Sequence, residues 1–493
     1  MKKINLEKLL LIFIAILPIL DMSSFLFRNY FNTNFSISTF IRPIIPIIII
    51  VIIFFKNKFK LKTILIGLIY FIYAIIHLHF FNKLKLGISF GTITHEAQYL
   101  INYTFAILNL FIFLFVFYKK ENKNKNINKI ILITNGIYIL SLYISIFTKT
   151  SSSTYIEGMG FKGWFESGNS ISAILILNLF IVFTLFNKVE NIKIKILAII
   201  EIILSGIFLT FLLGTRTGLY GFVLVIGLYI CSKLFILFRD IIANKNKKIN
   251  KKNKILLIAS SCLVICVICI VIFKGSSLLT RRKYLEQIES NIYDSQTGEP
   301  SHVTGDILKF KEDIENNKID ETYISKPMQT SIIELYNYAN NHEISNTDRR
   351  TQQLIFNTYL VKNQSNIFYI LFGNGFLNNY GELILEMEIP ALLFNFGLIG
   401  FILYFIPFFA LFIYYIYIGF KNIKIIDTEY VLLISGIAIS FVLSLLLGQL
   451  FFNSSASIII VCMNVLLYNK CVEIKSYTVD IDKNLKTKEP VTI

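Results

Sequence analysis

Residues 366–420 read NIFYILFGNGFLNNYGELILEMEIPALLFNFGLIGFILYFIPFFALFIYYIYIGF. The first half of this segment is polar, and it holds a glycine-rich turn at 373–375 and two closely spaced carboxylates, Glu386 and Glu388. The second half is apolar over more than the roughly 20 residues that a helix needs to cross a bilayer. The sequence therefore predicts an acidic segment that leads directly into a membrane-spanning helix, so that substrate would meet the protein at the boundary between water and lipid.

The composition is that of a membrane protein. Of the 493 residues, 55% are hydrophobic and 16% are charged, whereas soluble proteins carry about a quarter charged residues. The net charge of +17 does not indicate nucleic-acid binding, because the lysines stand in short clusters between apolar runs. The six cysteines fall in apolar runs or on the side predicted to be cytoplasmic, so no disulfide framework is implied. We expect an all-α polytopic protein of the plasma membrane.

Apolar runs long enough to cross a bilayer define the predicted spans. Twelve such runs occur, at 9–27, 37–55, 64–81, 99–118, 130–147, 169–186, 196–213, 218–238, 255–273, 391–418, 431–451 and 454–468. The last run is short, and it is expected to tilt or to lie shallow in the membrane. The first run resembles the core of a signal peptide, but it lacks a small-residue cleavage site and is kept as a span.

Lysine and arginine are distributed unevenly over the connecting segments. The basic segments are 1–8, 56–62, 119–129, 187–195, 239–254, 421–430 and 469–493. These seven segments hold 29 basic residues, whereas the alternate loops 28–36, 82–98 and 148–168 together hold five. Because positively charged loops stay on the cytoplasmic side, both termini are predicted to be cytoplasmic.

One predicted external loop, 274–388, is much longer than the others. It has 115 residues, of which 11 are basic and 16 acidic, and long segments cross a membrane largely regardless of charge. Ser345 or Thr347 could cap its last helix, whose apolar face is expected to lie on the membrane or on the bundle. The predicted loop helices are 281–293, 306–316, 327–341 and 348–362. The predicted divisions of the chain are spans one to nine (1–273), the extracellular loop (274–388), spans ten to twelve (389–468) and a cytoplasmic tail (469–493).

Three arginines are candidates for binding an anionic group at the external surface. Arg216 lies in the tight turn between predicted spans seven and eight. A guanidinium is always charged and binds phosphate oxygens with two donors, so Arg216 suits a diphosphate; alternatively, it only extends its head group to the interface. Arg349 and Arg350 stand in the first turn of the fourth loop helix, where a cation opposes the helix dipole. Such a local conflict often marks a site, although pairing with Asp348 would also explain it.

Two carboxylates precede predicted span ten. A carboxylate near lipid can serve as a general base, and Glu386 is favoured because the apolar residues before it bring it against a hydrophobic surface. Glu388 would contact substrate beside it, or both acids could simply be solvated at the interface. The Gly373-Asn374-Gly375 turn could let the backbone approach a sugar or phosphate, or it could be a plain turn.

Other polar and small residues give weaker indications. Gly397 and Gly400 are expected to permit close helix packing. His342 has no cysteine or spaced carboxylate set around it, and the sequence predicts no metal site. Trp164 could stack on a sugar ring or could anchor the chain at the interface. Asp21, at the end of the first apolar run, is interpreted as one half of a structural pair.

Several of these features occur together in one known group of proteins. They are the twelve-span layout, the long external loop, and the motifs FESGNS at 165–170, GTRTG at 214–218, FGNGF at 372–376 and GLIG at 397–400. With them, the chain resembles the O-antigen ligase/polymerase superfamily, which includes Wzy-type polysaccharide polymerases and ligases of lipid-linked glycans. Where the ligase branch has a His-Asn pair, this chain has Glu386-Met387, which is similar to the acidic form in Gram-positive capsule and exopolysaccharide polymerases.

The resemblance implies inverting glycosyl transfer at the outer face of the membrane, without metal, cofactor or nucleotide sugar. The donor would be an oligosaccharide on undecaprenyl diphosphate, attacked at its anomeric carbon by a hydroxyl of the acceptor oligosaccharide. Arg216 and one of Arg349 and Arg350 would hold the diphosphate and stabilise the leaving group. Glu386 would take the acceptor proton, with His342 as a second candidate. A flippase and chain-length regulators would be partners.

Two alternatives stay open. A ligase that attaches finished glycan to another acceptor would share the fold and the same residues, so the sequence barely separates it from a polymerase. A flippase for lipid-linked oligosaccharide can also have about twelve spans. Transporters, however, usually show repeated halves with charges near the membrane midplane, whereas the charged candidates of this chain gather on one face.

Overall fold

The computed structural model describes most of the chain. The described residues are 5–31, 37–55, 61–84, 93–118, 121–155, 159–243, 306–321, 324–344, 348–364, 366–376, 385–446, 448 and 450–486. Within these ranges the regular structure is helical apart from one short antiparallel hairpin, β1 paired with β2. The predicted ninth span at 255–273 and the predicted loop helix at 281–293 lie outside the described residues.

The elements follow one another along the chain in this order: α1 (Leu6–Phe31), α2 (Ile37–Phe55), α3 (Leu61–Leu84), α4 (Ile93–Phe117), α5 (Glu121–Phe147), β1 (Ser152–Ser153), β2 (Phe161–Gly163), α6 (Gly168–Lys188), α7 (Ile192–Ile207), the π-helical turn η1 (Phe208–Leu212), α8 (Arg216–Ala243), α11 (Asp306–Glu315), α12 (Lys326–Asn341), α13 (Arg349–Asn363), α14 (Ile367–Phe372), α15 (Glu388–Tyr404), α16 (Ile406–Lys421), α17 (Thr428–Leu446) and α18 (Ser454–Lys486).

Eight helices of the described chain are long and apolar enough to cross a membrane: α1, α4, α5, α6, α7 with η1, α8, α17 and α18. A ninth span results if α15 and α16, which meet at 45°, are counted as one bent span. Helices α2 and α3 contain shorter apolar stretches, Ile41–Phe55 and Ile64–His79. All these helices coincide with predicted apolar runs. The chain is therefore an all-α polytopic membrane protein, and the total of twelve spans stays a prediction.

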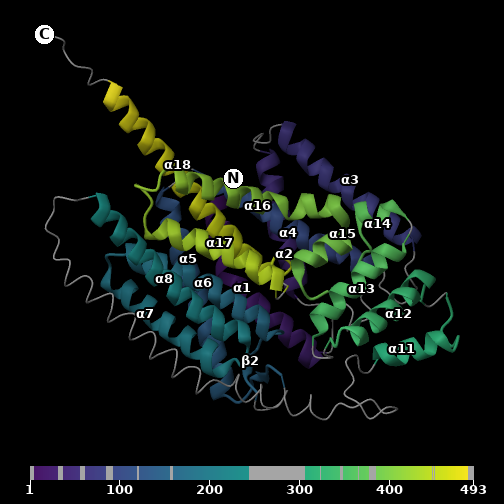
Figure 1. The fold of residues 1–493 in the computed structure, drawn as a ribbon. Coiled ribbons are helices and arrows are strands. Elements are labelled where there is room, and N and C mark those ends of the chain that lie inside the picture. The colour runs from purple at the N-terminus through teal and green to yellow at the C-terminus, as the bar shows by residue number, and fades with distance from the viewer. Residues whose placement is uncertain are drawn as a thin grey trace, which may run out of the picture.

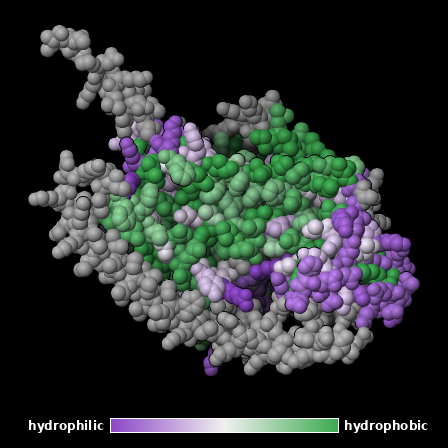
Figure 2. All heavy atoms as spheres, in the orientation of Figure 1, coloured by the Kyte–Doolittle hydropathy of each residue, from purple (hydrophilic) through white to green (hydrophobic). Residues whose placement is uncertain are grey.

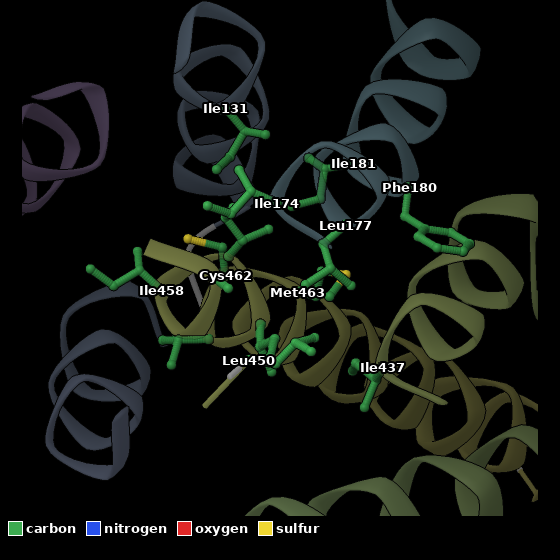
Figure 3. Packing of buried hydrophobic residues seen from close by; sticks show 14 of the residues in the cluster. Ile131, Ile174, Leu177, Phe180, Ile181, Ile437, Leu450, Ile458, Cys462 and Met463 are labelled. Carbon is green, nitrogen blue, oxygen red and sulfur yellow. The ribbon is translucent and has the colours of Figure 1, made fainter. Parts of the chain in front are cut away.

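Helix α6 lies at the centre of the bundle. It begins after the cap residue Ser167, and the residues that follow are apolar on all sides, which is typical of a fully buried helix. It contacts α5, α7, α8, α17 and α18. Leu177 of α6, Ile437 of α17 and Met463 of α18 belong to one buried cluster (Figure 3). The core of the bundle is thus organised around α6 and α18.

The last membrane helix is longer than predicted. The predicted run at 454–468 is short, but α18 continues to Lys486 and its apolar part extends over Ser454–Tyr477. Asn453 caps the start of the helix by accepting backbone N–H groups of its first turn at 3.0 Å. The expected shortness of this span is therefore wrong, because an apolar run marks only the most hydrophobic part of a helix and not its end; its tilt and depth in the membrane stay predictions.

Helix α15 is interrupted at Gly397. The φ angle there is +68°, a positive value that glycine adopts without steric cost. The break leaves the carbonyls of Phe394 and Asn395 without their helical partners. They accept the N–H groups of Asn374 and Gly375 at 2.8 and 2.9 Å. The predicted glycine turn therefore exists, and it completes the backbone hydrogen bonds of a broken membrane helix, where unpaired groups are costly.

Replacing Gly397 with alanine is expected to reduce the yield of folded protein strongly. A Cβ at this position would lie 2.5 Å from backbone atoms of Leu371 and Gly373. The extended positive-φ conformation of Gly397 (φ +68°, ψ −175°) costs a non-glycine residue about 1–3 kcal/mol, and overpacking adds about 1–3 kcal/mol. Size-exclusion profiles and thermal unfolding of the purified protein in detergent would measure the loss. Gly227→Ala is the control, because a Cβ at Gly227 meets no atom within 4 Å; a Gly397→Ala protein with the stability of Gly227→Ala would contradict the expectation.

The loop helices α11, α12 and α13 have a hydrophobic core of their own. Ile332 of α12 is fully buried together with Phe356 and Leu360 of α13. The apolar face of α13, predicted to lie on the membrane or the bundle, thus covers α12 instead. Figure 2 shows hydrophilic residues over α11, α12 and α13 and hydrophobic residues over the membrane helices. The three loop helices therefore form a small, water-facing layer beside the bundle.

The polar ends of the molecule are arranged on opposite sides. In Figure 1, β2 and the loop helices α11, α12 and α13 lie at one end of the bundle, and the C-terminal end of α18 projects from the other. The hairpin and the long loop are therefore on the same side. The assignment of that side to the cell exterior, with both termini in the cytoplasm, stays a prediction from the loop charges.

Candidate functional site

Arg350 and Glu386, two of the predicted catalytic residues, form an ion pair. Nε of Arg350 donates to a carboxylate oxygen of Glu386 at 3.2 Å, and the two side chains are 36% and 51% exposed. The backbone N–H of Glu386 also donates to the side chain of Gln353 at 3.0 Å. Two contacts with α13 therefore hold Glu386 in place while half of its side chain stays exposed. Arg350 is thus placed directly beside the carboxylate, and Arg349 precedes it as the first residue of α13.

Asp348 begins α13 and partly resolves the conflict between the arginines and the helix dipole. Its carboxylate accepts the N–H and the hydroxyl of Thr351 at 3.3 and 2.8 Å, so Asp348 is the N-cap. The prediction that Ser345 or Thr347 caps this helix is therefore wrong. An acidic N-cap stabilises a helix start, which helps the chain to place two cations in the same turn.

Arg216 is the first residue of α8, and it is exposed. The π-helical turn η1 stands just before it, and such turns are frequent at functional sites. Thr215 fixes the bend, because its hydroxyl accepts the N–H of Gly218 at 3.0 Å and lies 2.8 Å from the hydroxyl of Ser172 on α6. Within the described part of the chain, Arg216 itself makes no hydrogen bond or ion pair. Its guanidinium is therefore available to an anionic ligand.

A buried histidine and glutamate hold the glycine turn. His77 of α3 and Glu96 of α4 are 2% and 1% exposed, and they form a hydrogen bond of 2.6 Å. Glu96 also accepts the N–H of Phe376 at 2.6 Å, and the other ring nitrogen of His77 lies 2.7 Å from the carbonyl of Phe372. Asn374 in the turn is 1% exposed. The turn therefore has a structural role in joining α3 and α4 to the loop, and the contact of Asn374 with substrate stays a prediction.

Glu388 binds the backbone of the turn before α18. It is 2% exposed, and its carboxylate accepts the N–H groups of Leu450 and Phe451 at 2.9 and 3.0 Å and that of Phe452. These three donors occupy both oxygens of the buried carboxylate, which gives Glu388 a structural role, and its contact with substrate stays a prediction. Glu388 fastens the start of α15 to the turn that precedes α18.

His342 and Trp164 occupy peripheral positions. His342 ends α12, where its exposed ring stacks on Tyr338 with 4.0 Å between ring centroids. Trp164 follows β2 and donates to the hydroxyl of Thr150 at 2.9 Å. Their roles toward substrate stay predictions. Among the residues that the structure describes, no three His, Cys, Asp or Glu side chains gather closely enough to hold a metal ion.

A cavity of about 680 Å³ opens at the end of the bundle. It is formed by the end of α1, the start of α2, α4, the segment that leads into α6, and the start of α18. Small-molecule sites usually have volumes of about 300–1,000 Å³, so this cavity is large enough for a ligand. Aromatic rings, amides, hydroxyls and two arginine–carboxylate pairs make up its wall.

The two ion pairs of the cavity differ in exposure. Arg42 and Asp21 are 17% and 14% exposed and are paired, and Tyr138 donates a hydrogen bond to Asp21. Arg28 and Glu166 pair at 3.0 Å with exposures of 55% and 37%. Burial raises the pKa of the Glu166 carboxyl above its ordinary value, and the charge of Arg28 opposes that shift. The interpretation of Asp21 as half of a structural pair is thus confirmed.

The predicted catalytic residues do not line this cavity. In the described part of the chain, the cavity wall includes none of Arg216, Arg350 and Glu386. Residues next to Arg216 and Glu386 nevertheless contact segments that form the cavity wall. Thr215, next to Arg216, touches α6 one half-turn beyond Ser170, a wall residue. The segment that carries Glu386 continues into the carboxylate that holds the 450–452 turn, which supplies another part of the wall.

Sequence reasoning missed Arg42, which stands inside predicted span two. An ionisable residue within a span is costly and is a functional candidate by default, so the signal was present in the sequence. His77 and Glu96 were missed for a different reason. Their spacing suits no metal site, and their partners lie in the 372–376 turn, almost 300 residues away.

The family model for O-antigen ligase like membrane proteins matches residues 3–473. The chain belongs to this family. The predicted superfamily is thereby confirmed, and searches of curated proteins and of solved structures found no match. Membership implies that this O-antigen ligase like protein transfers glycosyl groups in a membrane and that its substrates are lipid-linked glycans.

The break in α15 and the family membership both bear on the alternative that the protein is a flippase. The interrupted helix α15 is a feature that transporters share, but here the carbonyls at the break are bonded to the glycine turn. These two carbonyls are therefore already bonded within the protein. Glycosyl transfer is favoured over flipping.

Proposed function

We propose that this O-antigen ligase like protein is a membrane glycan polymerase that joins oligosaccharide repeat units carried on undecaprenyl diphosphate. The observation that carries the proposal is the ion pair of Arg350 and Glu386. It holds a half-exposed carboxylate, able to accept a proton, beside a permanent cation, able to bind phosphate, immediately before a membrane helix. A family that acts on lipid-linked glycans needs both groups at such a boundary.

The proposed reaction is an inverting displacement that needs no metal ion. Glu386 accepts the proton of an acceptor hydroxyl, whose oxygen attacks the anomeric carbon of the donor sugar from the face opposite the diphosphate. The bond between the anomeric carbon and the phosphate oxygen breaks, and its electron pair leaves with undecaprenyl diphosphate. Arg216 and Arg350 stabilise the negative charge on that leaving group. When the diphosphate binds Arg350, the carboxylate of Glu386 is released for proton transfer.

A polymerase is favoured over a ligase by one feature of the sequence. The acidic Glu386-Met387 stands where the ligase branch has a His-Asn pair. A ligase would use the same cations for the same donor, and it would differ in the acceptor only. The experiment must therefore identify which molecule accepts the transferred glycan.

Purified protein in liposomes, supplied only with lipid-linked repeat units, is expected to form a ladder of longer lipid-linked chains. The ladder should form with a chelator present, because the proposed reaction needs no metal ion. It should also form without nucleotide sugar, because the bond between the donor sugar and the diphosphate already carries the needed free energy. Cells that lack the protein should accumulate single repeat units on lipid. Transfer only to an acceptor without a lipid would show a ligase, and movement of repeat units across the bilayer without bond formation would show a flippase.

A further inference from the structure

The cavity between α1, α2, α4, α6 and α18 is separate from the catalytic groups proposed above, and its charges cancel. Arg28 and Arg42 contribute two positive charges, and Asp21 and Glu166 contribute two negative ones, each arginine being paired with one carboxylate. A diphosphate would require an excess of positive charge, as at Arg216. The cavity therefore suits a ligand that is polar but uncharged.

Neutral hydrogen-bonding groups also line the cavity. The amide side chains of Gln98 and Asn102 on α4 and of Asn453 before α18 line the cavity, together with serine hydroxyls such as that of Ser170. The amides of Gln98 and Asn102 offer donors and an acceptor, the amide of Asn453 offers its N–H groups because its oxygen caps α18, and each hydroxyl offers both. Closely spaced groups of this kind match the alternating donors and acceptors of sugar hydroxyls.

One wall of the cavity is aromatic. Tyr99 stacks on Phe376 with 3.5 Å between ring centroids and lies 4.6 Å from Phe452, and all three residues line the cavity. Large flat rings supply apolar contact area at little cost in side-chain entropy. A sugar ring has one face of C–H groups and an edge of hydroxyls, so it can use this wall and the amides together.

The two ion pairs give the cavity a fixed part and an adaptable part. Arg42 and Asp21 are almost buried and are held by Tyr138, so they shape the interior. Arg28 and Glu166 are far more exposed, and an exposed ion pair contributes little to stability. The outer pair can therefore open and let ring hydroxyls bind between the guanidinium and the carboxylate.

We propose that this cavity is a carbohydrate subsite, which binds uncharged sugar residues of the lipid-linked glycan at a place separate from the diphosphate. The identity of the glycan rests on the proposed function, whereas the affinity for sugar does not. The glycan would extend from the catalytic groups through the cavity, and the GTRTG turn and the 450–452 turn would join the two sites.

The single tryptophan of the chain makes the subsite directly measurable. Trp164 stands next to Phe165 and two residues before Glu166, both of which line the cavity. The probe is the free oligosaccharide released by mild acid from the lipid-linked fraction of the producing cells. It is expected to change the fluorescence of Trp164 in a saturable way.

Variants of the cavity wall locate the binding. Asn102→Ala removes one hydrogen-bonding group and should weaken binding about tenfold, and Ser170→Leu should block the cavity by filling it. Asn109→Ala is the matched control, because Asn109 lies two turns further along α4, donates to the carbonyl of Phe105 and does not line the cavity. Equal binding by all three variants would overturn the proposal.

Inorganic diphosphate is the second probe. A fluorescence change with diphosphate but none with the oligosaccharide, lost in Arg28→Gln, would show an anion site and overturn the proposal; no change with either probe would also overturn it. Extension of the bound free oligosaccharide would place the acceptor in the cavity, and inhibition without extension would place the donor glycan there. Both results support a sugar subsite.

The same measurements separate this proposal from the proposed function. Arg216→Ala should lower the rate of transfer about 10²–10³-fold and retain oligosaccharide binding. If Arg216→Ala lowers transfer in this way but the unmodified protein binds no oligosaccharide, the subsite fails and the polymerase stands. If the unmodified protein binds the oligosaccharide but Arg216→Ala transfers normally, the proposed function of Arg216 fails and the subsite stands.

Discussion

Arg216→Ala is expected to lower the rate of glycan transfer about 10²–10³-fold, the usual cost of removing one preorganised group that stabilises a leaving or developing anion. The side chain is exposed at the start of α8, and Thr215 holds the bend. Loss of the guanidinium should therefore leave folding and membrane insertion unchanged. The rate of chain extension in liposomes and the polymer length in cells would measure the effect.

Two further variants make this result specific. Arg216→Lys keeps the charge but loses the two-donor geometry that matches phosphate, so an intermediate rate is expected. Lys326→Ala removes a cation from the loop helices, where Lys326 is 78% exposed and pairs with Glu321, and it should leave transfer unchanged. Polymer of normal length from Arg216→Ala would show that the diphosphate is bound elsewhere.

Glu386→Gln is expected to lower the rate of transfer about 10²–10⁴-fold, the range that general base catalysis contributes. Glutamine has nearly the shape of glutamate, and its amide oxygen can still accept the hydrogen bond from Arg350. The contact of the Glu386 backbone with Gln353 is unaffected. The substitution thus removes the capacity to take a proton and little else, and single-turnover rates with saturating lipid-linked donor would report it.

Glu334→Gln is the matched control for this substitution. Glu334 also pairs with a cation of α13, since Lys362 lies 3.4 Å from its carboxylate. It differs from Glu386 in belonging to α12 and standing apart from the membrane helices. Loss of transfer in both variants would indicate a general effect of the charge on the loop helices, and a Glu386→Gln enzyme within twofold of normal would exclude Glu386 as the base.

The fold was predictable from the sequence wherever the local pattern of apolar residues is enough to locate a helix along the chain. Apolar runs located the membrane helices, and the pattern in the loop located α11, α12 and α13. The break at Gly397 was not predictable, because its carbonyls are satisfied by Asn374 and Gly375, which stand some twenty residues earlier. The apolar face of α13 was assigned to the wrong partner for the same reason, since periodicity identifies a face and not what covers it.

The candidate site was likewise predictable only in part from the sequence. The sequence indicates that an acid or a cation in an apolar run needs a partner, and the Asp21 prediction succeeded on that ground. It does not say which partner, and so the pairing of Asp21 with Arg42 and that of His77 with Glu96 appeared only in three dimensions. Glu386 and Glu388 are two residues apart, yet one is half-exposed and the other is buried. Spacing alone could not separate a chemical role from a structural one.

The separate hydrophobic core of the outer helices has an evolutionary consequence. Because α12 and α13 are held together by residues such as Ile332 and Phe356, their water-facing surfaces can diverge without disturbing the lipid-embedded scaffold. Relatives that act on different glycans can thus keep the same arrangement of membrane helices and change the surface of α11, α12 and α13. Sequence variation should accordingly concentrate on that surface, and the scaffold beneath it should change slowly.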